Sequence, residues 1–522
     1  MRSGGRVCLI GAGPGDPGLM TARGVRLLAE ADVVVYDRAV EAALRWARPD
    51  AERIAAGAPA ERETAQDAIS MLLAEKAREG HMVARLKWGD PFVFDSGAKE
   101  ALFLYEQGVP FEVVPGVPVA VGATAYAGVP VTYPGAGDAV VLLRGHESET
   151  ESLPDVDWTS LVAVEGTIVC YVGGRLAARV LGSLVDAGLD PDEPAALVFN
   201  GTLPGQRTLS GTVRSLAASL AERETDAGTA LLVVGQVAAL RDHLRWFDDR
   251  PLFGRRILVT RSPEQAGELV DELEGLGAQA IIAPTFRVGP PDDPEAVERA
   301  AAGLDKYRWV VFESATAVTR LLGALARGPR DLRAFGGVSV CAIGPSTAER
   351  LRAGGIKPDI VVPELRVDSV GEAMAAAGSL VGQQVLVVRP DHLREALAGD
   401  LAARGADVTD LVAYRTAAEA PESPVVQEIY RMLLDGQIDA VTFTSPTAVR
   451  RFAALFGDAE AADLLNTTVV GAIGPVTAAA ARELGVRSPL VPDVFTVDGL
   501  VQALVQALGA TRAGEPARRP RA

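Results

Sequence analysis

The second half of this 522-residue chain contains an internal duplication, and a duplication restricts the folds that a sequence can adopt. Four runs occur twice in the same order: ILVTR (257–261) as VLVVR (385–389), LVDELEGLGAQA (269–280) as LAGDLAARGADV (397–408), SATAV (314–318) as SPTAV (445–449), and AIGPSTA (342–348) as AIGPVTA (472–478). Each copy alternates strand-like runs with amphipathic helical stretches. The duplication therefore predicts two similar α/β lobes.

The same alternation extends over the first half, from VCLIGAG at 7–13 onward. It predicts a mainly parallel α/β architecture in both halves. The periodicity stops between Trp246 and Arg256, where a charged segment with Pro and Gly intervenes. We expect a first domain over 1–247, a linker over 248–256, a second domain over 251–510 and a short disordered tail over 511–522.

The net charge, the cysteines and the histidines argue against a nucleic-acid-binding or metal-binding function. The formal net charge of −17 argues against a nucleic-acid partner, because phosphate neutralisation needs a basic face. Cys8, Cys170 and Cys341 lie far apart in apolar runs, which favours buried free thiols in a reducing compartment over a catalytic or metal-binding role. The four histidines are also scattered, so no metal site is expected.

The sequence also favours a cytoplasmic protein without a membrane partner. Its start passes directly into a strand-like run and has no apolar signal segment. The uncharged stretch from Val113 to Gly137 exceeds 20 residues, but its four prolines and five glycines would break a membrane helix.

Six turns in the second half lie where a parallel sheet binds ligands, beyond the carboxyl ends of the strands. They are TRSPE (260–264), FESAT (312–316), AIGPS (342–346), VRPD (388–391), FTSPT (443–447) and AIGPV (472–476). Each offers backbone N–H groups at a helix start, and these suit carboxylates or phosphates. The alternative for each turn is helix capping alone. Six of them in two lobes predict a large, multiply anionic ligand.

The second half resembles uroporphyrinogen-III synthase over residues 251–510. The resemblance is carried by VTR (259–261), FTSPTAV (443–449), AIGPVTA (472–478) and LVAYRT (411–416). It implies one lobe over 251–288 and 416–510, and a second, inserted lobe over 289–415. It also implies that hydroxymethylbilane, a linear tetrapyrrole with eight carboxylates, is cyclised with inversion of ring D. The rival hypothesis is a two-lobed binding protein for another polyanion.

The resemblance also implies site residues. Tyr414 matches a tyrosine thought to assist the departing hydroxyl as a general acid, and its alternative role is capping a strand in the hinge. Thr444, Ser445, Gly474 and Thr477 match positions that hold substrate carboxylates. Three arginines that follow strands could add bidentate contacts, namely Arg261, Arg389 and Arg415. Glu313 departs from the hydroxyl-type pattern of its turn, so no binding role is assigned to it.

The first half begins with GPGDPG at 13–18, which fits GxGxxG, and Asp37 ends the next strand-like run. NAD binding is not favoured, because Pro14 and Pro17 remove backbone donors that a pyrophosphate needs. Residues 1–247 instead resemble the tetrapyrrole methylases, specifically uroporphyrinogen-III C-methyltransferase. The matching runs are GAGPGDPGLMT (11–21), VVVYDRAV (33–40), RLKWGDPFVF (85–94), VVPGVPVAVGATAYAGVP (113–130), NGTLPGQRTLSGT (200–212) and ALLVVGQVAALRDHLRWF (230–247).

This second resemblance implies S-adenosylmethionine as methyl donor, with uroporphyrinogen III as a tetrapyrrole partner and a homodimer formed through this domain. The cofactor contacts carried over by match are Pro14, Gly89, Asp90, Val121, Ala123 and Ala230. Methyl transfer from a sulfonium depends largely on alignment of the two reactants. For Gly and Pro at these positions, plain turn geometry is the alternative.

The sequence departs from the methylase pattern on the expected substrate side. Asp95 to Glu100 reads DSGAKE where the family has Gly-Arg-Gly-Gly-Glu-Glu, so Ser96 and Lys99 replace an arginine and a nearby acid. Trp88 stands where a glycine gave room, and Thr132-Tyr133-Pro134 replaces Thr-His-Arg. Two hypotheses remain: a working or altered methylase, and a catalytically dead scaffold or S-adenosylmethionine-binding regulatory module beside an active synthase.

Overall fold

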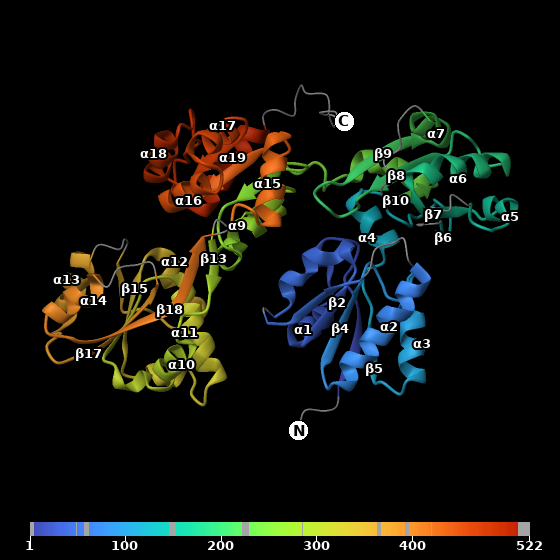
Figure 1. Cartoon of the computed structure of the whole chain (residues 1–522). Coiled ribbons are helices and arrows are strands. Elements are labelled where there is room, and N and C mark those ends of the chain that lie inside the picture. The colour runs from blue at the N-terminus through green and yellow to red at the C-terminus, as the bar shows by residue number, and fades with distance from the viewer. Residues whose placement is uncertain are drawn as a thin grey trace. The chain divides into compact units, whose positions relative to one another are not determined.

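The computed structural model describes residues 5–48, 50–56, 62–145, 153–221, 229–283, 286–362, 367–391, 396–418 and 420–509. The chain forms two compact units, unit 1 over Met1–Gly254 and unit 2 over Arg255–Ala522 (Figure 1). The tail predicted over 511–522 lies outside the described residues.

Unit 1 begins with a five-stranded, fully parallel sheet in the order β3-β2-β4-β1-β5. Its strands are β1 (Arg6–Gly11), β2 (Val33–Tyr36), β3 (Glu52–Ala55), β4 (Met82–Lys87) and β5 (Phe111–Val114). The helices of this part are α1 (Ala22–Glu30), α2 (Arg62–Arg78), α3 (Gly97–Glu106) and α4 (Val119–Tyr126), with 3-10 segments η1 (Pro17–Leu19) and η2 (Arg38–Trp46). The central strands are buried, as expected for a parallel sheet covered on both faces. They are mostly apolar, but β4 also carries the buried Arg85 and Lys87.

The second sheet of unit 1 differs from the predicted parallel pattern. Its order is β6-β7-β10-β8-β9, and only β6 and β7 are parallel. The strands are β6 (Ala139–Arg144), β7 (Gly166–Gly173), β8 (Pro194–Phe199), β9 (Arg207–Thr212) and β10 (Thr229–Val234). The other segments are α5 (Trp158–Val162), α6 (Gly174–Asp186), α7 (Val213–Ala221), η4 (Gln236–Leu240) and α8 (Arg241–Leu244). The chain turns back between β8 and β9, where Asn200 and Thr202 adopt positive φ, so these strands pair as a hairpin.

The segment after Trp246 belongs to unit 1, and its Phe247 ring lies 4.7 Å from the Tyr126 ring, centroid to centroid. Leu252 is fully buried, and the Phe247 and Phe253 rings meet edge to face with centroids 5.3 Å apart. The Arg250 guanidinium lies 4.7 Å from the centroid of the Trp246 ring, within cation–π range. Part of the stretch predicted as a linker therefore contributes to the end of unit 1.

Unit 2 contains two sheets. The first has the order β12-β11-β19-β20 and is parallel, with β11 (Arg256–Val259), β12 (Gln279–Ile282), β19 (Ala440–Phe443) and β20 (Val469–Ala472). The second has the order β13-β18-β17-β14-β15-β16, with β13 (Phe286–Gly289), β14 (Trp309–Phe312), β15 (Ser339–Ile343), β16 (Ile360–Val362), β17 (Gln384–Pro390) and β18 (Asp407–Ala418). Only the pairing of β13 with β18 is antiparallel in this sheet.

The topology of unit 2 repeats as the sequence does. The order β12-β11-β19-β20 corresponds to β18-β17-β14-β15, and Leu490 adds a parallel bridge to Gly471 where β16 stands in the other sheet. The helices are α9 (Pro263–Gly275), α10 (Pro294–Ala302), α11 (Ala315–Arg327), α12 (Pro345–Ala353), α13 (Val367–Ala377), α14 (Ala396–Ala403), α15 (Pro424–Leu434), α16 (Pro446–Phe456), α17 (Asp458–Leu465), α18 (Pro475–Leu484) and α19 (Val497–Gly509), with 3-10 segments η5 (Leu304–Lys306) and η6 (Leu332–Phe335). The predicted duplicated α/β architecture is confirmed.

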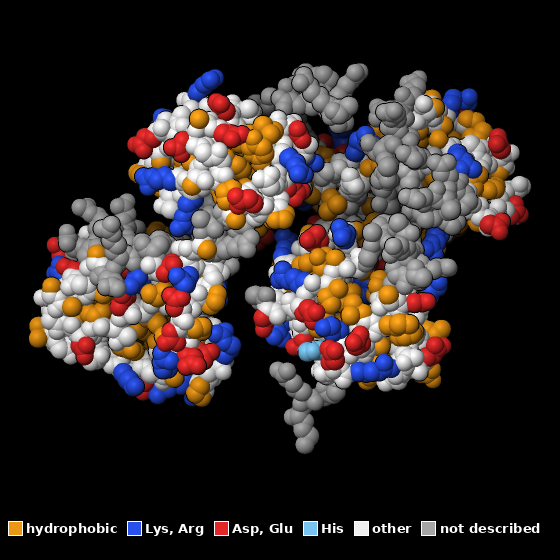
Figure 2. Space-filling view, viewed as in Figure 1, with side chains coloured by type: hydrophobic (Ala, Val, Ile, Leu, Met, Phe, Trp, Pro, Cys, Tyr) orange, Lys and Arg blue, Asp and Glu red, His pale blue; other side chains and the backbone are white. Residues whose placement is uncertain are grey.

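The surface carries charges of both signs (Figure 2), and the three cysteines are buried, as the sequence predicted. Lys and Arg side chains are interspersed with Asp and Glu side chains over the face shown in Figure 2. Cys8, Cys170 and Cys341 are free and buried, and burial raises the pKa of the Cys8 thiol to about 11. None of the helices in the described part of the chain has the length and apolarity needed to cross a bilayer.

Candidate functional site

Tyr414 is positioned by an irregularity in β18. The register between β17 and β18 shifts by one residue, so that Arg389 pairs with Val412 and Pro390 pairs with Tyr414. A strand normally points successive side chains to opposite faces, whereas a bulge re-aims one of them. Ala413 and Tyr414 consequently pack in the same core cluster, beside α10 and α11, and Tyr414 is only 4% exposed.

The Tyr414 hydroxyl lies at the start of α11. Its oxygen is 3.0 Å from Ser314 Oγ, and Ser314 Oγ also accepts a hydrogen bond from Ala317 N at 3.1 Å. Thr316 Oγ1 receives a hydrogen bond from Gln265 Nε2 of α9 at 3.3 Å. Because α9 and α11 follow strands of different sheets, this chain of polar groups joins the two lobes of unit 2 next to the phenol.

Two opposing effects act on the acidity of Tyr414. Burial raises the pKa of its phenol, whereas the hydrogen bonds from Ser314 and Thr316 lower it. The negative charges of Asp391 and Glu313 raise it further. The phenol is therefore protonated at neutral pH and can act as a proton donor.

Asp391 and Arg451 complete the charges around Tyr414. Asp391 follows β17, and its Oδ1 accepts hydrogen bonds from Thr416 N at 2.9 Å and Thr416 Oγ1 at 3.1 Å. Arg451 comes from α16, in the other lobe. Burial lowers the pKa of the Arg451 guanidinium, and the nearby Tyr414 and Asp391 raise it. The Arg451 charge is thus near enough to interact with the charges of Tyr414 and Asp391 in the other lobe.

The predicted carboxylate-binding residues lie on the turns of the first sheet of unit 2. Arg261 Nε donates to Thr444 Oγ1 at 3.0 Å, which connects the turns after β11 and β19. Ser445 Oγ accepts from Ala448 N at 3.2 Å and so caps α16. Gly474 is the N-cap residue of α18, and Thr477 in its first turn is buried. Burial lowers the pKa of the Arg261 guanidinium and the charge of Glu268 raises it, and no Asp or Glu side chain of the described residues forms an ion pair with Arg261.

The other two predicted arginines are engaged within the protein. Arg389 is buried, and its Nε and Nη2 atoms each donate to the Asp410 carboxylate at 2.7 Å. This bidentate pair has the geometry that a substrate carboxylate would need. Arg415 is half-exposed and forms an ion pair with Asp292, and its Nε lies 3.8 Å from Asp391 Oδ2. Of the three arginines, Arg261 is the one best placed to receive substrate.

Several residues of this site were not singled out from the sequence. Ser314 and Thr316 lie in the predicted turn FESAT (312–316) and Asp391 lies in the predicted turn VRPD (388–391), but no role was assigned to them individually. Ser314 also matches Ser445 in the duplication, which was a signal for it. Gln265 and Arg451 lie outside the predicted turns and belong to the other lobe.

Unit 1 brings its predicted cofactor turns together at the carboxyl ends of β1 and β4. Gly13 and Gly89 form a two-way backbone bridge, with N–O distances of 3.2 and 2.8 Å. Asp90 accepts hydrogen bonds from Phe92 N at 2.8 Å and Gly116 N at 3.0 Å. A Cβ on Gly116 would lie 2.1 Å from the Gly89 carbonyl oxygen, so this close backbone approach requires glycine.

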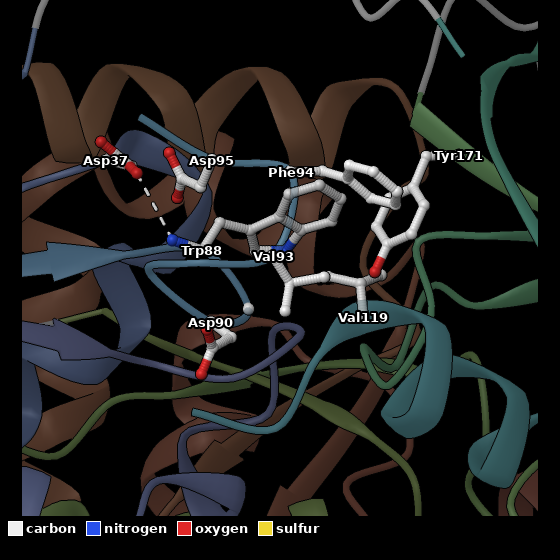
Figure 3. A pocket seen from close by; sticks show the side chains of 9 residues that line it. Asp37, Trp88, Asp90, Val93, Phe94, Asp95, Val119 and Tyr171 are labelled. Atoms are coloured by element: carbon white, nitrogen blue, oxygen red, sulfur yellow. Dashed lines mark hydrogen bonds between the residues drawn. The ribbon is translucent and has the colours of Figure 1, made fainter. Parts of the chain in front are cut away.

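A cavity of about 110 Å³ adjoins these turns. Its lining is Asp37, Trp88, Gly89, Asp90, Val93, Phe94, Asp95, Val119 and Tyr171 (Figure 3). Trp88 Nε1 donates to the Pro14 carbonyl at 2.8 Å, so the indole closes the space above the first turn. Figure 3 shows the rings of Phe94 and Tyr171 to one side of Trp88 and the carboxylates of Asp37 and Asp95 to the other. The cavity wall is therefore aromatic and acidic.

The cations next to this cavity are buried in ion pairs. Lys87 is fully buried and its Nζ lies 3.0 Å from Asp95 Oδ1 and 3.1 Å from Glu100 Oε1. Ser96, which replaces the expected arginine, accepts a hydrogen bond from Lys87 Nζ at 2.9 Å. Lys99 is exposed on α3. The position at which the resemblance implies an arginine thus carries the neutral hydroxyl of Ser96, and the neighbouring Lys87 ammonium is already paired.

The remaining predicted cofactor residues lie on α4 and β10. Val121 is 46% exposed and Ala123 is buried. A Cβ on Gly122 would meet Pro14 Cγ at 2.6 Å, so α4 packs directly on the first turn. Ala230 packs in the core cluster with α6 and α7, on the face of its sheet that is turned away from α4. Only its backbone can therefore face the turns around Pro14.

Both halves match known families. Residues 267–502 match the family described as uroporphyrinogen-III synthase HemD, and residues 6–217 match the tetrapyrrole (corrin/porphyrin) methylases. The chain is 34% identical over 508 residues to the porphyrin biosynthesis protein HemD of Ruminiclostridium josui, an alignment covering 97% of this chain and 98% of that protein. The chain belongs to the HemD family of porphyrin-biosynthesis proteins. It is a fusion of a methyltransferase-like domain with a HemD-type synthase domain, and both resemblances inferred from the sequence are confirmed.

Further relatives match the methyltransferase-like half of this HemD family member. Siroheme synthase 2 of Pectobacterium atrosepticum is 44% identical over 248 residues, which are 47% of this chain and 53% of that protein. The chain thus spans about half the length of that relative. The solved uroporphyrin III C-methyl transferase of Thermus thermophilus is 36% identical, covers 45% of this chain and all of that structure, and has a TM-score of 0.40.

Proposed function

We propose that unit 2 cyclises hydroxymethylbilane to uroporphyrinogen III with inversion of ring D. The observation that carries this proposal is the Tyr414 phenol, which is protonated, buried at the carboxyl edge of its sheet and held 3.0 Å from Ser314 Oγ. A proton donor at this edge suits a reaction that begins with loss of a hydroxyl group. The sequence match to the HemD synthases supports the same reaction class.

In this proposal Tyr414 donates its proton as the carbon–oxygen bond of the substrate breaks, and the hydroxyl leaves as water. The electron pair of that bond leaves with oxygen, so the bilane becomes a cation. Attack by the ring D carbon and rearrangement close the macrocycle, and the proton released at the end restores the phenol. Arg451 stabilises the transient phenolate, since opposite charges attract strongly in a partly buried site.

Substrate carboxylates are held by the turns of the other lobe. Arg261 and Thr444 form one group, and Ser445, Gly474 and Thr477 lie at the starts of α16 and α18, where backbone N–H groups favour anions. Arg389 is assigned to structure because Asp410 occupies its guanidinium. The test is the isomer formed from hydroxymethylbilane, since a binding protein for another polyanion would not direct ring closure to type III.

We further propose that unit 1 binds S-adenosylmethionine and methylates a tetrapyrrole carbon of uroporphyrinogen III. The Gly13–Gly89 bridge and the close approach of Gly116 to Gly89 hold the turns after β1, β4 and β5 together by backbone contact, which supports a cofactor site built on these turns. The cofactor would be held by the turns of Pro14, Gly89 and Asp90, by Val121 and Ala123 of α4 and by the backbone at Ala230. When bound, it supplies an electrophilic methyl group.

The specific support for this second activity is the 44% identity over 248 residues with a siroheme synthase. Calorimetric titration with S-adenosylmethionine and a methylation assay on uroporphyrinogen III test it. Binding without methyl transfer would indicate a regulatory module, and absence of binding would indicate a scaffold.

The resemblance to the methyltransferases also underlies a proposed cytoplasmic homodimer through unit 1. Light scattering of the full chain, expected at twice 54.5 kDa, tests the dimer.

A further inference from the structure

Glu313 is a buried carboxyl group to which the proposed reaction assigns no role. It directly follows β14 and is 8% exposed, and its Oε2 atom has no hydrogen-bond partner among the described residues. Its backbone N–H donates to the Val388 carbonyl at 3.1 Å, which fixes the residue at the carboxyl edge of the sheet. A carboxyl group buried with an unsatisfied oxygen costs free energy, so this position calls for a functional reason.

The groups around Glu313 come from the neighbouring strands. Arg389 directly follows Val388, whose carbonyl accepts the Glu313 N–H, and Arg389 and Asp410 of β18 are bound to each other in a bidentate pair. Because Asp410 already neutralises Arg389, little positive charge is left to hold Glu313 ionised. Burial raises the pKa of Glu313 to about 7, with Arg389 lowering it and Asp410 raising it.

Glu313 is also coupled to the Tyr414 phenol. The next residue, Ser314, lies 3.0 Å from the Tyr414 hydroxyl, and the charge of Glu313 raises the pKa of Tyr414. A negative charge at Glu313 makes the phenolate less favourable. Protonation of Glu313 removes that charge and makes Tyr414 a stronger acid.

We propose, on the basis of the synthase function proposed above, that Glu313 is a positioning residue whose charge controls proton donation by Tyr414. Neutral Glu313 favours departure of the substrate hydroxyl, and ionised Glu313 opposes it. Asp391, the other carboxylate near the phenol, accepts hydrogen bonds from Thr416 N and Thr416 Oγ1 and is left unchanged in the variants that test this proposal. The synthase is therefore faster when Glu313 carries its proton.

The experiment compares the pH dependence of kcat for uroporphyrinogen III formation in the full chain, between pH 6 and 8.5. The variants are Glu313→Gln, which keeps the size of the neutral acid, and Glu349→Gln, an exposed glutamate on α12, as the matched control. The wild type and the control should slow by about three- to tenfold through pH 7, because general-acid catalysis senses part of a change in acid strength. The ratio of Glu313→Gln to wild type should rise by the same factor.

A ratio that stays constant over this range in an active wild-type protein would overturn the inference and leave the proposed function intact. A wild type that forms no uroporphyrinogen III would instead remove the proposed function and the inference with it. If Glu313→Gln does not fold, the pH dependence of Tyr414→Phe tests the proposal instead. Its residual rate must lack the decline through pH 7, since no phenol remains to be controlled, and a persisting decline contradicts the proposal.

Discussion

The side-chain oxygens of Ser314 and Tyr414 lie 3.0 Å apart, at the point where a repeated helix cap meets a bulged strand. Ser445 caps α16 in the other lobe with nearly the same backbone conformation as Ser314. Among the described residues, the Ser314 cap has a tyrosine partner, whereas no such partner is seen for Ser445. In the proposed synthase function, this asymmetry would separate a lobe that carries the acid from a lobe whose turns hold substrate carboxylates.

Tyr414→Phe should lower kcat for uroporphyrinogen III formation by about a hundredfold, within the range typical of a general acid. The fold should be retained, because loss of one hydrogen bond costs about 1 kcal/mol. Single-turnover kinetics with hydroxymethylbilane measures the effect. Tyr430→Phe, which removes a surface hydroxyl bonded to Glu460, is the control and should turn over normally. Equal rates for the two variants would exclude Tyr414 as the acid.

Arg451→Met should lower kcat by about tenfold, because a cation near Tyr414 stabilises the phenolate formed during proton donation. The adjacent Arg450 is exposed on the same helix, so Arg450→Met removes the same charge away from the phenol. Steady-state assays of both variants give kcat and KM separately. A higher KM with unchanged kcat in Arg451→Met would assign Arg451 to substrate binding instead.

Glu313 should make the stability of unit 2 depend on pH. Its folded-state pKa of about 7 lies above the ordinary value of 4.5, so its stabilising contribution is complete below pH 4.5 and is lost as pH rises through 7. The difference corresponds to about 3 kcal/mol. Hydrogen exchange at the β14 amides should show that the free energy of opening falls with rising pH in the wild type, relative to Glu313→Gln. Parallel pH profiles of the two proteins would contradict it.

Trp88→Gly should strengthen binding of S-adenosylmethionine to unit 1 by about five- to tenfold. The reason is that opening the cavity in the wild type breaks the Trp88–Pro14 hydrogen bond, worth about 1 kcal/mol. Isothermal titration calorimetry measures the dissociation constants. Trp88→Phe keeps an aromatic ring but has no N–H donor, so it separates the effect of the hydrogen bond from the effect of side-chain size. Weaker binding in Trp88→Gly would show that the indole supports the cofactor.

The sequence predicted the features that depend on local pattern. The repeats specified two α/β lobes in unit 2, and the turns at strand ends were correctly placed because parallel strands leave them on one edge. The mixed second sheet of unit 1 was not predicted, since strand direction depends on how β8, β9 and β10 return rather than on their apolar runs.

The charged groups of the site were harder to predict. Arg389 and Asp410 are 21 residues apart, and only the register of β17 against β18 shows that they bind each other. The register shift that turns Tyr414 toward Ser314 lies at Pro390 of β17, so its sequence signal stands on the neighbouring strand and not beside Tyr414. Arg451 reaches the phenol from another lobe, so no spacing in the sequence connects them.

The isomer composition of the product tests the central claim most directly. Purified full-length chain is incubated with hydroxymethylbilane, and the uroporphyrinogen formed is oxidised and separated into types I and III. We expect predominantly type III with the wild type and a large loss of type III with Tyr414→Phe. Type I alone, at the rate found without protein, would contradict it.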